Sequence, residues 1–241
     1  MGRTFENRKQ AMAKRGARDS KNFTRCGRQI TIAVKAGGGD PDGNPALRRA
    51  MQNARAVNMP KDKVQNAIDK ALKLGDTSDF QQIVYEGYAA HGIALMVETA
   101  TDNPTRTVAN VRNVFNKCGG NLGNSGSVAF MFTQMGVFRL KPEDVDRDSM
   151  ELELIDFGLE EITDAQDDDG NALLHFYCGS TEFGNLQAKL EELKAPIVSS
   201  GFEWVPSTTT ELDDEKLDDV LKLVNKLEDD DDVQAVFHNL G

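Results

Sequence analysis

The sequence has little of what builds a disulfide scaffold or a metal centre. Its 241 residues include three cysteines and three histidines. Cys26, Cys118 and Cys178 are far apart, odd in number and outside any Cys-x-x-Cys pair, which predicts reduced thiols. No histidine lies near a cysteine or another histidine at the spacing of metal ligands. We therefore expect neither a metal ion nor a cofactor.

Long apolar runs are missing too. No stretch approaches the roughly 20 apolar residues that a membrane span needs. The basic N-terminus is not followed by the apolar core of a secretory signal. A length of 241 residues with 39% hydrophobic content suits two or three packed domains. These features predict a soluble protein of the cytoplasm without a membrane partner.

Recognisable catalytic signatures are also absent. The sequence has no nucleophile elbow. The glycine-rich stretch from Cys118 to Ser127 looks like a phosphate cradle, but no Gly-Lys-Ser/Thr follows, and it leads into a strand instead of opening a helix. We favour a tight connection with glycines at positive φ, and the alternative is backbone amides that contact RNA or a ribosome. We predict that the protein is not an enzyme and has no small-molecule substrate.

Acidic residues outnumber basic ones, and the formal net charge is −11. The charge is distributed unevenly along the chain. Residues 1–75 hold 17 lysines and arginines against 6 aspartates and glutamates, a net charge of +11. The remainder holds 11 against 33, a net charge of −22. A basic domain tied to an acidic one can bind a polyanion at one end and repel it elsewhere.

The positive charge is densest at the N-terminus, where only Glu6 and Asp19 oppose it. Cations this close together can displace several counterions from a phosphate backbone at once. A solvated helix face would have the same composition, but we predict that this segment binds nucleic acid. The predicted nucleic-acid-binding residues are Arg3, Arg8, Lys9, Lys14, Arg15, Arg18, Lys21, Arg25 and Arg28.

Helical periodicity dominates the basic part of the chain. Asn44 can cap a helix whose first residue is Pro45. Phe5 and Phe23 could stack on bases, although for Phe23 we favour core packing. These residues predict a small helical bundle with a projecting first helix. Helical segments are expected over residues 3–18, 20–36, 45–57 and 61–74.

From about residue 80 the pattern changes to short β-rich runs between amphipathic helices. Residues 136–205 show the order strand, helix, strand, strand, helix, strand, which is typical of a ferredoxin-like unit. The last helix and strand make poor sense alone, so we expect them to return to the sheet of residues 80–135. Strands are expected over residues 83–85, 93–97, 127–132, 137–140, 159–165, 172–178, 197–205 and 233–237, and helices over 105–117, 142–156, 181–194 and 213–227.

The predicted fold class is therefore a multi-domain α+β protein. It combines an N-terminal helical bundle, a central α/β domain and an inserted ferredoxin-like (βαββαβ) domain. We expect the basic helical domain over residues 1–78, the discontinuous central domain over 79–135 plus 206–241, and the inserted domain over 136–205.

Two charged motifs favour structural roles. Asp102 or Asn103 can cap the helix that begins near Pro104, and Arg106 could reach an anion at that positive helix end. The aspartates at 229–232 lack the ligand pattern of a calcium loop. We favour a solvated acidic turn there, with weak Mg²⁺ or Ca²⁺ binding as the alternative.

Short motifs in a fixed order along nearly the whole chain resemble the YebC/PmpR family. That family includes the mitochondrial translational activator of cytochrome c oxidase subunit I. None of the motifs is diagnostic alone, but the ordered set is highly specific. The motifs are Ala33 with Gly37-Gly38-Gly39-Asp40-Pro41, Asn58-Met59-Pro60-Lys61-Asp62, Tyr85-Glu86-Gly87-Tyr88, Thr101-Asp102-Asn103, Arg106-Thr107-Val108-Ala109, Gly119-Gly120-Asn121-Leu122-Gly123, Gly126-Ser127-Val128 and the acidic run Glu228 to Val233.

The resemblance implies three domains, with the third inserted into the second. It also implies transcriptional regulation through DNA binding, or translation at the ribosome on difficult sequences such as proline runs. It implies no catalytic residue and no cofactor. The start of the chain departs from the family pattern, because many members begin Gly-His-Ser-Lys-Trp-Ala-Asn-Ile and residues 2–8 here read Gly-Arg-Thr-Phe-Glu-Asn-Arg. A role of that family His, Lys or Trp therefore does not transfer.

Residues and resemblance together predict a nucleic-acid-binding regulator of gene expression, acting as a monomer through its basic N-terminal domain. DNA, RNA and the ribosome are the expected partners. The physical features lean towards RNA or the ribosome, because no element has the character of a helix-turn-helix recognition helix. The alternative is a protein-interaction adaptor whose acidic domains bind a protein while the basic arm adds electrostatic affinity. Salt dependence separates the two.

Overall fold

The computed structural model describes residues 2–73, 80–167 and 169–241, and for residues 2–15 and 144 it describes the main chain alone. The chain is an α+β protein with three N-terminal helices followed by two four-stranded antiparallel sheets with helices. Among the described helices, none is long and apolar enough to cross a membrane.

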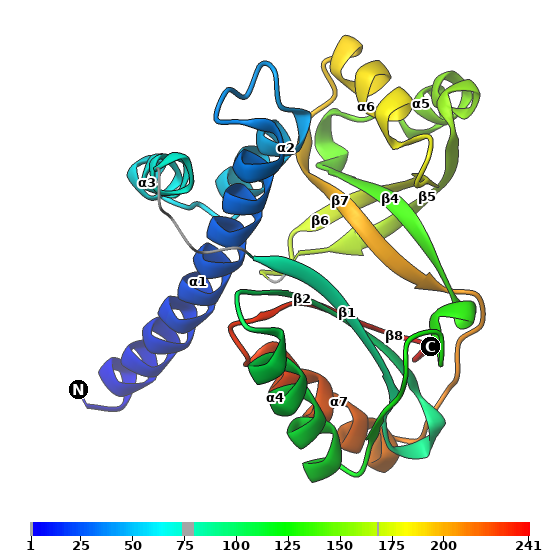
Figure 1. Cartoon of the computed structure of the whole chain (residues 1–241). Coiled ribbons are helices and arrows are strands. Elements are labelled where there is room, and N and C mark those ends of the chain that lie inside the picture. Colours follow the sequence, from blue (N-terminus) through cyan, green and yellow to red (C-terminus); the bar gives the residue numbers. More distant parts are fainter. Residues whose placement is uncertain (1, 74–79, 168) are drawn as a thin grey trace. The chain divides into compact units, whose positions relative to one another are not determined.

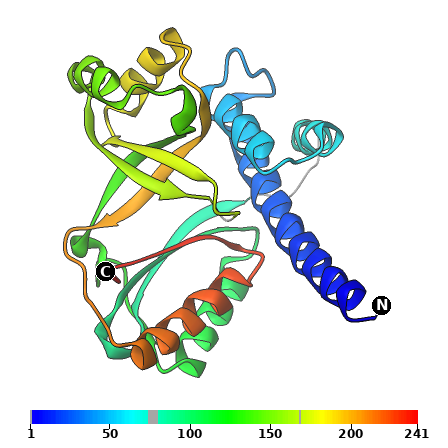
Figure 2. The same cartoon turned by 180° about the vertical axis from the view of Figure 1, so that it is seen from behind.

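The N-terminal region is built on one long helix. Helix α1 (Gly2–Gly37) is continuous, and α2 (Pro45–Ala56) and α3 (Lys61–Leu72) pack against it. Its N-terminal half projects beyond α2 and α3 (Figures 1 and 2). The prediction of a projecting first helix is thus confirmed. Of the helix expected over residues 61–74, Lys73 is the C-cap that follows α3, and residue 74 lies outside the described chain.

The core of this bundle comes from the apolar positions of all three helices. Phe23 packs against its edge, as the sequence predicts, and Lys63 lies over the Phe23 ring. Burying these side chains stabilises the bundle by about 25 cal/mol for each Å² of apolar surface removed from water. The buried core residues are Cys26, Ile30, Ala33, Val34, Leu47, Ala50, Ala54, Met59, Val64 and Ile68.

Asn44 joins α1 to α2. Its side-chain oxygen accepts from the Leu47 amide at 3.1 Å, which caps α2, and Pro45 occupies the first helical position. Its amide nitrogen donates to the carbonyls of Ala33 and Gly38 at 2.8 Å each. The predicted cap is confirmed, and the same side chain also binds backbone carbonyls near the end of α1.

The first sheet has the strand order β3-β1-β2-β8. The C-terminal strand lies beside β2, so it returns to the first sheet as the sequence predicts. Helices α4 (Pro104–Lys117) and α7 (Asp214–Glu228) precede β3 and β8 in the chain. The strands are β1 (Gln81–Tyr88), β2 (Ala94–Thr101), β3 (Asn121–Leu122) and β8 (Val233–His238).

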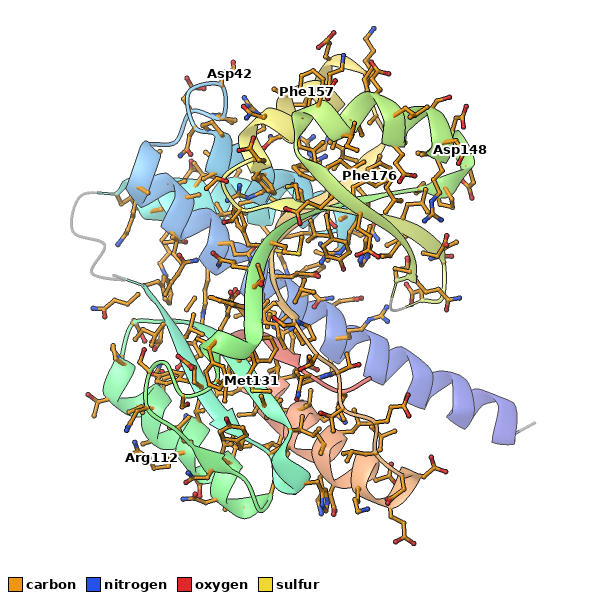
Figure 3. The ribbon with its side chains drawn as sticks, turned by 90° about the vertical axis from the view of Figure 1, so that its right-hand side faces the viewer. Asp42, Arg112, Met131, Asp148, Phe157 and Phe176 are labelled. Atoms are coloured by element: carbon orange, nitrogen blue, oxygen red, sulfur yellow. The ribbon has the colours of Figure 1, made fainter. Side chains whose placement is uncertain are left out.

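The second sheet has the strand order β5-β6-β4-β7 with antiparallel neighbours. Helices α5 (Arg147–Leu154) and α6 (Phe183–Glu192) cover one face of it (Figure 1). Phe176, labelled in Figure 3, is fully buried in the core that they enclose. The strands are β4 (Phe132–Leu140), β5 (Leu159–Gln166), β6 (Ala172–Gly179) and β7 (Ile197–Pro206).

Two predicted elements are wrong. The expected strand over residues 127–132 is a loop and a 3-10 helix, Ala129–Met131, and the strand begins at Phe132. The expected helix over 142–156 is interrupted, because Val145 is extended and packs against the second core, and α5 starts afterwards. The short strand β3 inside the glycine-rich stretch was not predicted.

By its internal contacts the chain divides into two compact units. The first consists of Met1–Val84, Val97–Val114 and Val224–Val236. The second consists of Tyr85–Met96, Phe115–Leu223 and Phe237–Gly241. The contacts of α1 described below all lie within the first unit.

Candidate nucleic-acid interface

The predicted binding residues all belong to α1. Arg3, Arg8, Lys9, Lys14 and Arg15 lie on its projecting half, where the main chain is helical and the side chains are outside the described part. Arg18, Lys21, Arg25 and Arg28 lie further along and are half-buried. The structure thus places the two groups in different surroundings along one helix.

The second group forms a stripe on α1. Arg18, Lys21, Arg25 and Arg28 are three, four and three residues apart, which puts them on one side of a helix with 3.6 residues per turn. The spacing continues backwards in the sequence to position 14, a lysine. This periodicity was visible in the sequence, and it indicates one basic face over residues 14–28 of the helix.

Lys21 and Arg25 of this face contact the acidic turn, which we define as residues 228–232. Lys21 forms an ion pair with Asp229. Arg25 donates to the main-chain carbonyls of Glu228 and Val233, both at 3.1 Å. Since Glu228 is the last residue of α7, Arg25 places its charge at the negative end of that helix, where a cation is stabilising.

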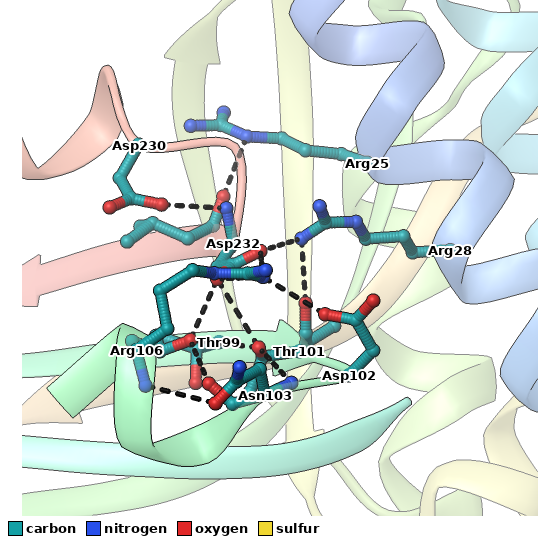
Figure 4. A network of polar contacts seen from close by, with 12 residues as sticks. Arg25, Arg28, Thr99, Thr101, Asp102, Asn103, Arg106, Asp230 and Asp232 are labelled. Atoms are coloured by element: carbon teal, nitrogen blue, oxygen red, sulfur yellow. Dashed lines mark hydrogen bonds and ion pairs between the residues drawn. The ribbon is translucent and has the colours of Figure 1, made fainter. Parts of the chain in front are cut away.

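Arg28 reaches deeper into the same unit. Its guanidinium donates to the carboxylate of Asp232 at 2.9 Å and to the Ala100 carbonyl at 2.7 Å (Figure 4). The Phe80 ring lies 5.2 Å from the Arg28 guanidinium carbon, within the range of a cation–π contact. Arg28 therefore links α1 to β2 and to the acidic turn.

Asp232 is the centre of this network. Its carboxylate accepts from the hydroxyls of Thr107 at 2.7 Å and Thr101 at 3.2 Å, and from Arg106 at 3.0 Å. Burial alone would raise the pKa of Asp232, but hydrogen bonds from Thr107 and Arg106 and the charge of Arg28 outweigh it and lower the pKa. The carboxylate is therefore held ionised although it is 3% exposed.

The start of α4 supplies half of these partners. Asn103 accepts from the Arg106 amide at 3.1 Å, so the predicted capping motif is confirmed. Arg106 also pairs with Asp102 at 2.9 Å. The anions that Arg106 meets at this helix end are thus carboxylates of the same chain.

The prediction of a solvated acidic turn is wrong for Asp232, although Asp229 and Asp231 are exposed. Asp232 is buried because its partners come from α1, β2 and α4, which are distant in the sequence. An open depression of about 580 Å³ lies beside it in the first unit. Its lining residues are Arg28, Phe80, Asp102, Arg106, Asn110 and Asp229 to Asp232.

The glycine-rich stretch holds a carboxylate of its own. Glu86 of β1 accepts from the main-chain amides of Gly126 at 2.7 Å and of Val128 and Ala129 at 2.8 Å each. Gly126 has φ of 84°, a conformation that glycine adopts without the strain of a side chain. The favoured interpretation, a tight connection with glycines at positive φ, is confirmed. In a phosphate cradle, main-chain amides bind a phosphate. Here the three amides bind a carboxylate of the same chain.

Glu86 is 6% exposed and ionised by the same balance as Asp232. Burial raises the pKa of its carboxyl, and the hydrogen bonds from Gly126, Val128, Ala129 and Ser127 outweigh this and lower it. Sequence reasoning missed Glu86, although it belongs to one of the motifs that carry the family resemblance.

Further cations lie on α2 and α3 and were not predicted as binding residues. All are exposed, and they add to the positive charge of the three-helix bundle. They are Arg48, Arg55, Lys61, Lys63, Lys70 and Lys73.

The described side chains also include potential metal ligands and nucleophiles. Within the described residues there is no cluster of His, Cys, Asp or Glu side chains that could hold a metal ion. The three cysteines are free, and burial raises the pKa of the Cys26 and Cys178 thiols to about 11 each. These two thiols are therefore poor nucleophiles.

Family models match almost the whole chain. The model described as "TACO1/YebC protein N-terminal domain" matches residues 3–74, and "TACO1/YebC second and third domain" matches residues 80–240. Proteins of Anaeromyxobacter dehalogenans and Myxococcus xanthus are each 55% identical over 241 residues, with both chains fully covered. A protein of Flavobacterium johnsoniae is 49% identical over 240 residues, covering 100% of this chain and 99% of its own. Each is named "Probable transcriptional regulatory protein".

The fold also has a close match among solved structures. The crystal structure of a conserved hypothetical protein from Aquifex aeolicus superposes with a TM-score of 0.83 at 35% identity. The match covers 95% of this chain and 93% of that one.

Proposed function

Because this chain belongs to the TACO1/YebC family, we propose that it is a transcriptional or translational regulator that binds nucleic acid through the cations of α1. The observation that carries the proposal is the continuity of α1 from Gly2 to Gly37, since the candidate cations thereby lie on one helix. A helix of this kind presents positive charge along a phosphate backbone. The names of the relatives support regulation and give no hint of catalysis.

The binding residues proposed are Arg3, Arg8, Lys9, Lys14, Arg15, Arg18, Lys21, Arg25 and Arg28, with the projecting half of α1 making the first contacts. The exposed cations of α2 and α3 widen this surface. The acidic remainder of the chain repels phosphate and so orients the polyanion on the helical bundle.

We further propose three domains with the limits expected from the sequence, residues 1–78, 79–135 plus 206–241, and 136–205. The second sheet supports a ferredoxin-like third domain, because its elements follow the order βαββαβ and its strands the order β5-β6-β4-β7. As a regulator of gene expression the protein would act in the cytoplasm as a monomer.

RNA or a ribosome is the preferred target within this proposal. The described helices of the N-terminal region are one long helix and two short ones that pack on it. A helix-turn-helix protein instead places a short recognition helix in the major groove. Phosphate contacts along α1 need no base-reading side chains.

A second candidate function, the protein-interaction adaptor, is favoured by exposed apolar side chains on α5 and on the 3-10 helix after it, Ile155–Phe157. Leu152 is 79% exposed, Ile155 62% and Phe157 37%. The carboxylates of Asp148 and Glu151 on α5 are exposed as well, and Asp148 and Phe157 are labelled in Figure 3. This composition fits a partner segment that is basic and apolar.

The test is binding of the purified protein to ribosomes, duplex DNA and single-stranded RNA over a salt series. The test variant changes Arg8, Lys9, Lys14 and Arg15 together to Glu. The control changes Lys117, Lys141, Lys222 and Lys226 together to Glu, an equal change of charge at exposed positions outside the bundle. We expect the first variant to lose binding and to keep its thermal unfolding, and the control to retain most binding.

The salt dependence separates the two functions. If about five phosphates are neutralised, log K against log[salt] slopes by roughly −3.5 for single strands and −4.5 for duplex. A flat plot, with ribosome binding lost on Leu152→Asp, would favour the adaptor and contradict direct binding of nucleic acid.

A further inference from the structure

The acidic turn covers part of the face of α1 on which the proposed function rests. Three consecutive cations of the basic stripe, Lys21, Arg25 and Arg28, all bind this turn or its neighbouring strand. The partners they use are a carboxylate, main-chain carbonyls and a second carboxylate. A phosphate backbone offers the same chemistry, which is anionic oxygen acceptors at close spacing.

We propose that the acidic turn is an internal competitor that occupies the C-terminal half of the basic face, so that nucleic acid must displace it to use the full length of α1. The competition follows from charge and geometry. A carboxylate and a phosphodiester each carry a single negative charge on oxygen, and a cation paired with one is less available to the other. The tethered turn also has a high effective concentration at α1.

The contacts between α1 and the acidic turn are weakest at Lys21 and strongest at Arg28, so nucleic acid displaces them in that order. Asp232 is buried among Arg28, Thr101 and Thr107 and is part of the packed structure. Asp229 is 69% exposed, and its partner Lys21 is 38% exposed. Nucleic acid that advances along α1 from its projecting half therefore reaches the weakest contact first and can release Lys21 without disturbing Asp232.

A competitor of this kind makes binding more selective. A ligand with one or two phosphates gains too little from Lys21 to displace Asp229. A continuous polyanion already held by the projecting half of α1 reaches Lys21 intramolecularly. The turn thereby favours long polyanions over small phosphorylated molecules.

The experiment compares Asp229→Asn with Asp218→Asn, which removes the same charge from an exposed position on α7 outside the turn. Affinity is measured for a labelled single-stranded RNA and for a duplex DNA of equal length. We expect Asp229→Asn to bind about two- to five-fold more tightly than wild type, the range set by an exposed ion pair. Asp218→Asn should bind like wild type.

A double-mutant cycle assigns the gain to Lys21. Lys21→Gln should weaken binding little in the wild type, where Asp229 neutralises the lysine, and more in the Asp229→Asn background. Thermal unfolding of each variant checks that the fold is kept. Inorganic phosphate, used as a short competitor of RNA binding, should have a lower inhibition constant in Asp229→Asn than in wild type, because Lys21 is no longer paired with Asp229.

The outcomes separate this inference from the function on which it rests. Equal affinity of Asp229→Asn and Asp218→Asn, with salt-dependent binding by both, overturns the internal competitor and leaves the proposed function standing. Additive effects of Lys21→Gln and Asp229→Asn overturn it as well. Absence of binding by wild type and by Asp229→Asn, at every salt concentration and with the fold intact, defeats both proposals.

Discussion

Two buried carboxylates, Glu86 in the glycine-rich connection and Asp232 in the acidic turn, occupy places where the sequence suggests an external ligand. Both are nearly inaccessible to water and both remain ionised. Their partners differ in kind. Glu86 is held by main-chain amides, and Asp232 by two guanidinium groups and two hydroxyls.

The difference shows two ways in which a fold can stabilise a buried negative charge. The amides around Glu86 are neutral dipoles fixed by a backbone conformation that includes a positive φ at Gly126. The partners of Asp232 include full charges on long side chains from separate elements. The first arrangement shapes a local turn, and the second joins α1, β2, α4 and the acidic turn within one unit.

The largest effect is expected from removing the charge at Asp232. In Asp232→Asn the guanidinium groups of Arg28 and Arg106 lose their shared carboxylate, and breaking such a buried pair costs about 3 kcal/mol of unfolding free energy. Urea unfolding measures the loss. Asp231→Asn, an exposed neighbour with the same charge change, is the control and should unfold like wild type. Equal stability of the two variants would contradict the central role of Asp232.

A smaller loss is expected at Glu86. Glu86→Gln keeps one acceptor oxygen but turns an amide donor towards main-chain donors, which costs about 2 kcal/mol for the lost charge-assisted hydrogen bonds. The exposed Glu151→Gln serves as the matched control. Hydrogen exchange of the Val128 and Ala129 amides should accelerate in Glu86→Gln, and unchanged protection there would show that the carboxylate does not hold the turn.

The smallest effect is expected from acidification to about pH 3, which should remove only part of the stability that the two carboxylates contribute. Their pKa values are lowered in the folded protein, so the unfolded state binds protons first, near pH 4. The stability they contribute is present above that pH and is lost as pH falls through the lower folded values. The free energy of unfolding of wild type, measured down to about pH 3, should therefore approach the values of Asp232→Asn and Glu86→Gln. If the difference in unfolding free energy between wild type and the variants instead widens on acidification, the two pKa values are not lowered by folding.

Much of the fold could be predicted because its signals are local. Asn44 with Pro45 and Asn103 with Pro104 mark helix starts by capping chemistry that acts within one turn. The order of strands and helices in residues 132–206 follows from periodicity. The return of β8 to the first sheet followed from its inability to form a core alone.

The errors arise where a distant residue decides local structure. Residues 127–132 have β-forming side chains, yet Glu86 binds the amides of Val128 and Ala129 and turns the chain into a 3-10 helix. Val145 breaks a helical pattern because the second core takes its side chain. Intrinsic propensity yields to tertiary contacts at both places.

The sequence by itself determined the charge asymmetry, the spacing of cations on α1, most of the elements and the family. Composition and periodicity are properties of the sequence, so they can be determined without knowing any tertiary contact. The tertiary structure alone decided which charges are paired, because Lys21 meets Asp229, and Arg28 meets Asp232, across more than two hundred residues. Ion pairs between such distant residues depend on how the chain folds. The sequence therefore predicted a solvated acidic turn, whereas the structure surrounds Asp232 with residues of α1, β2 and α4.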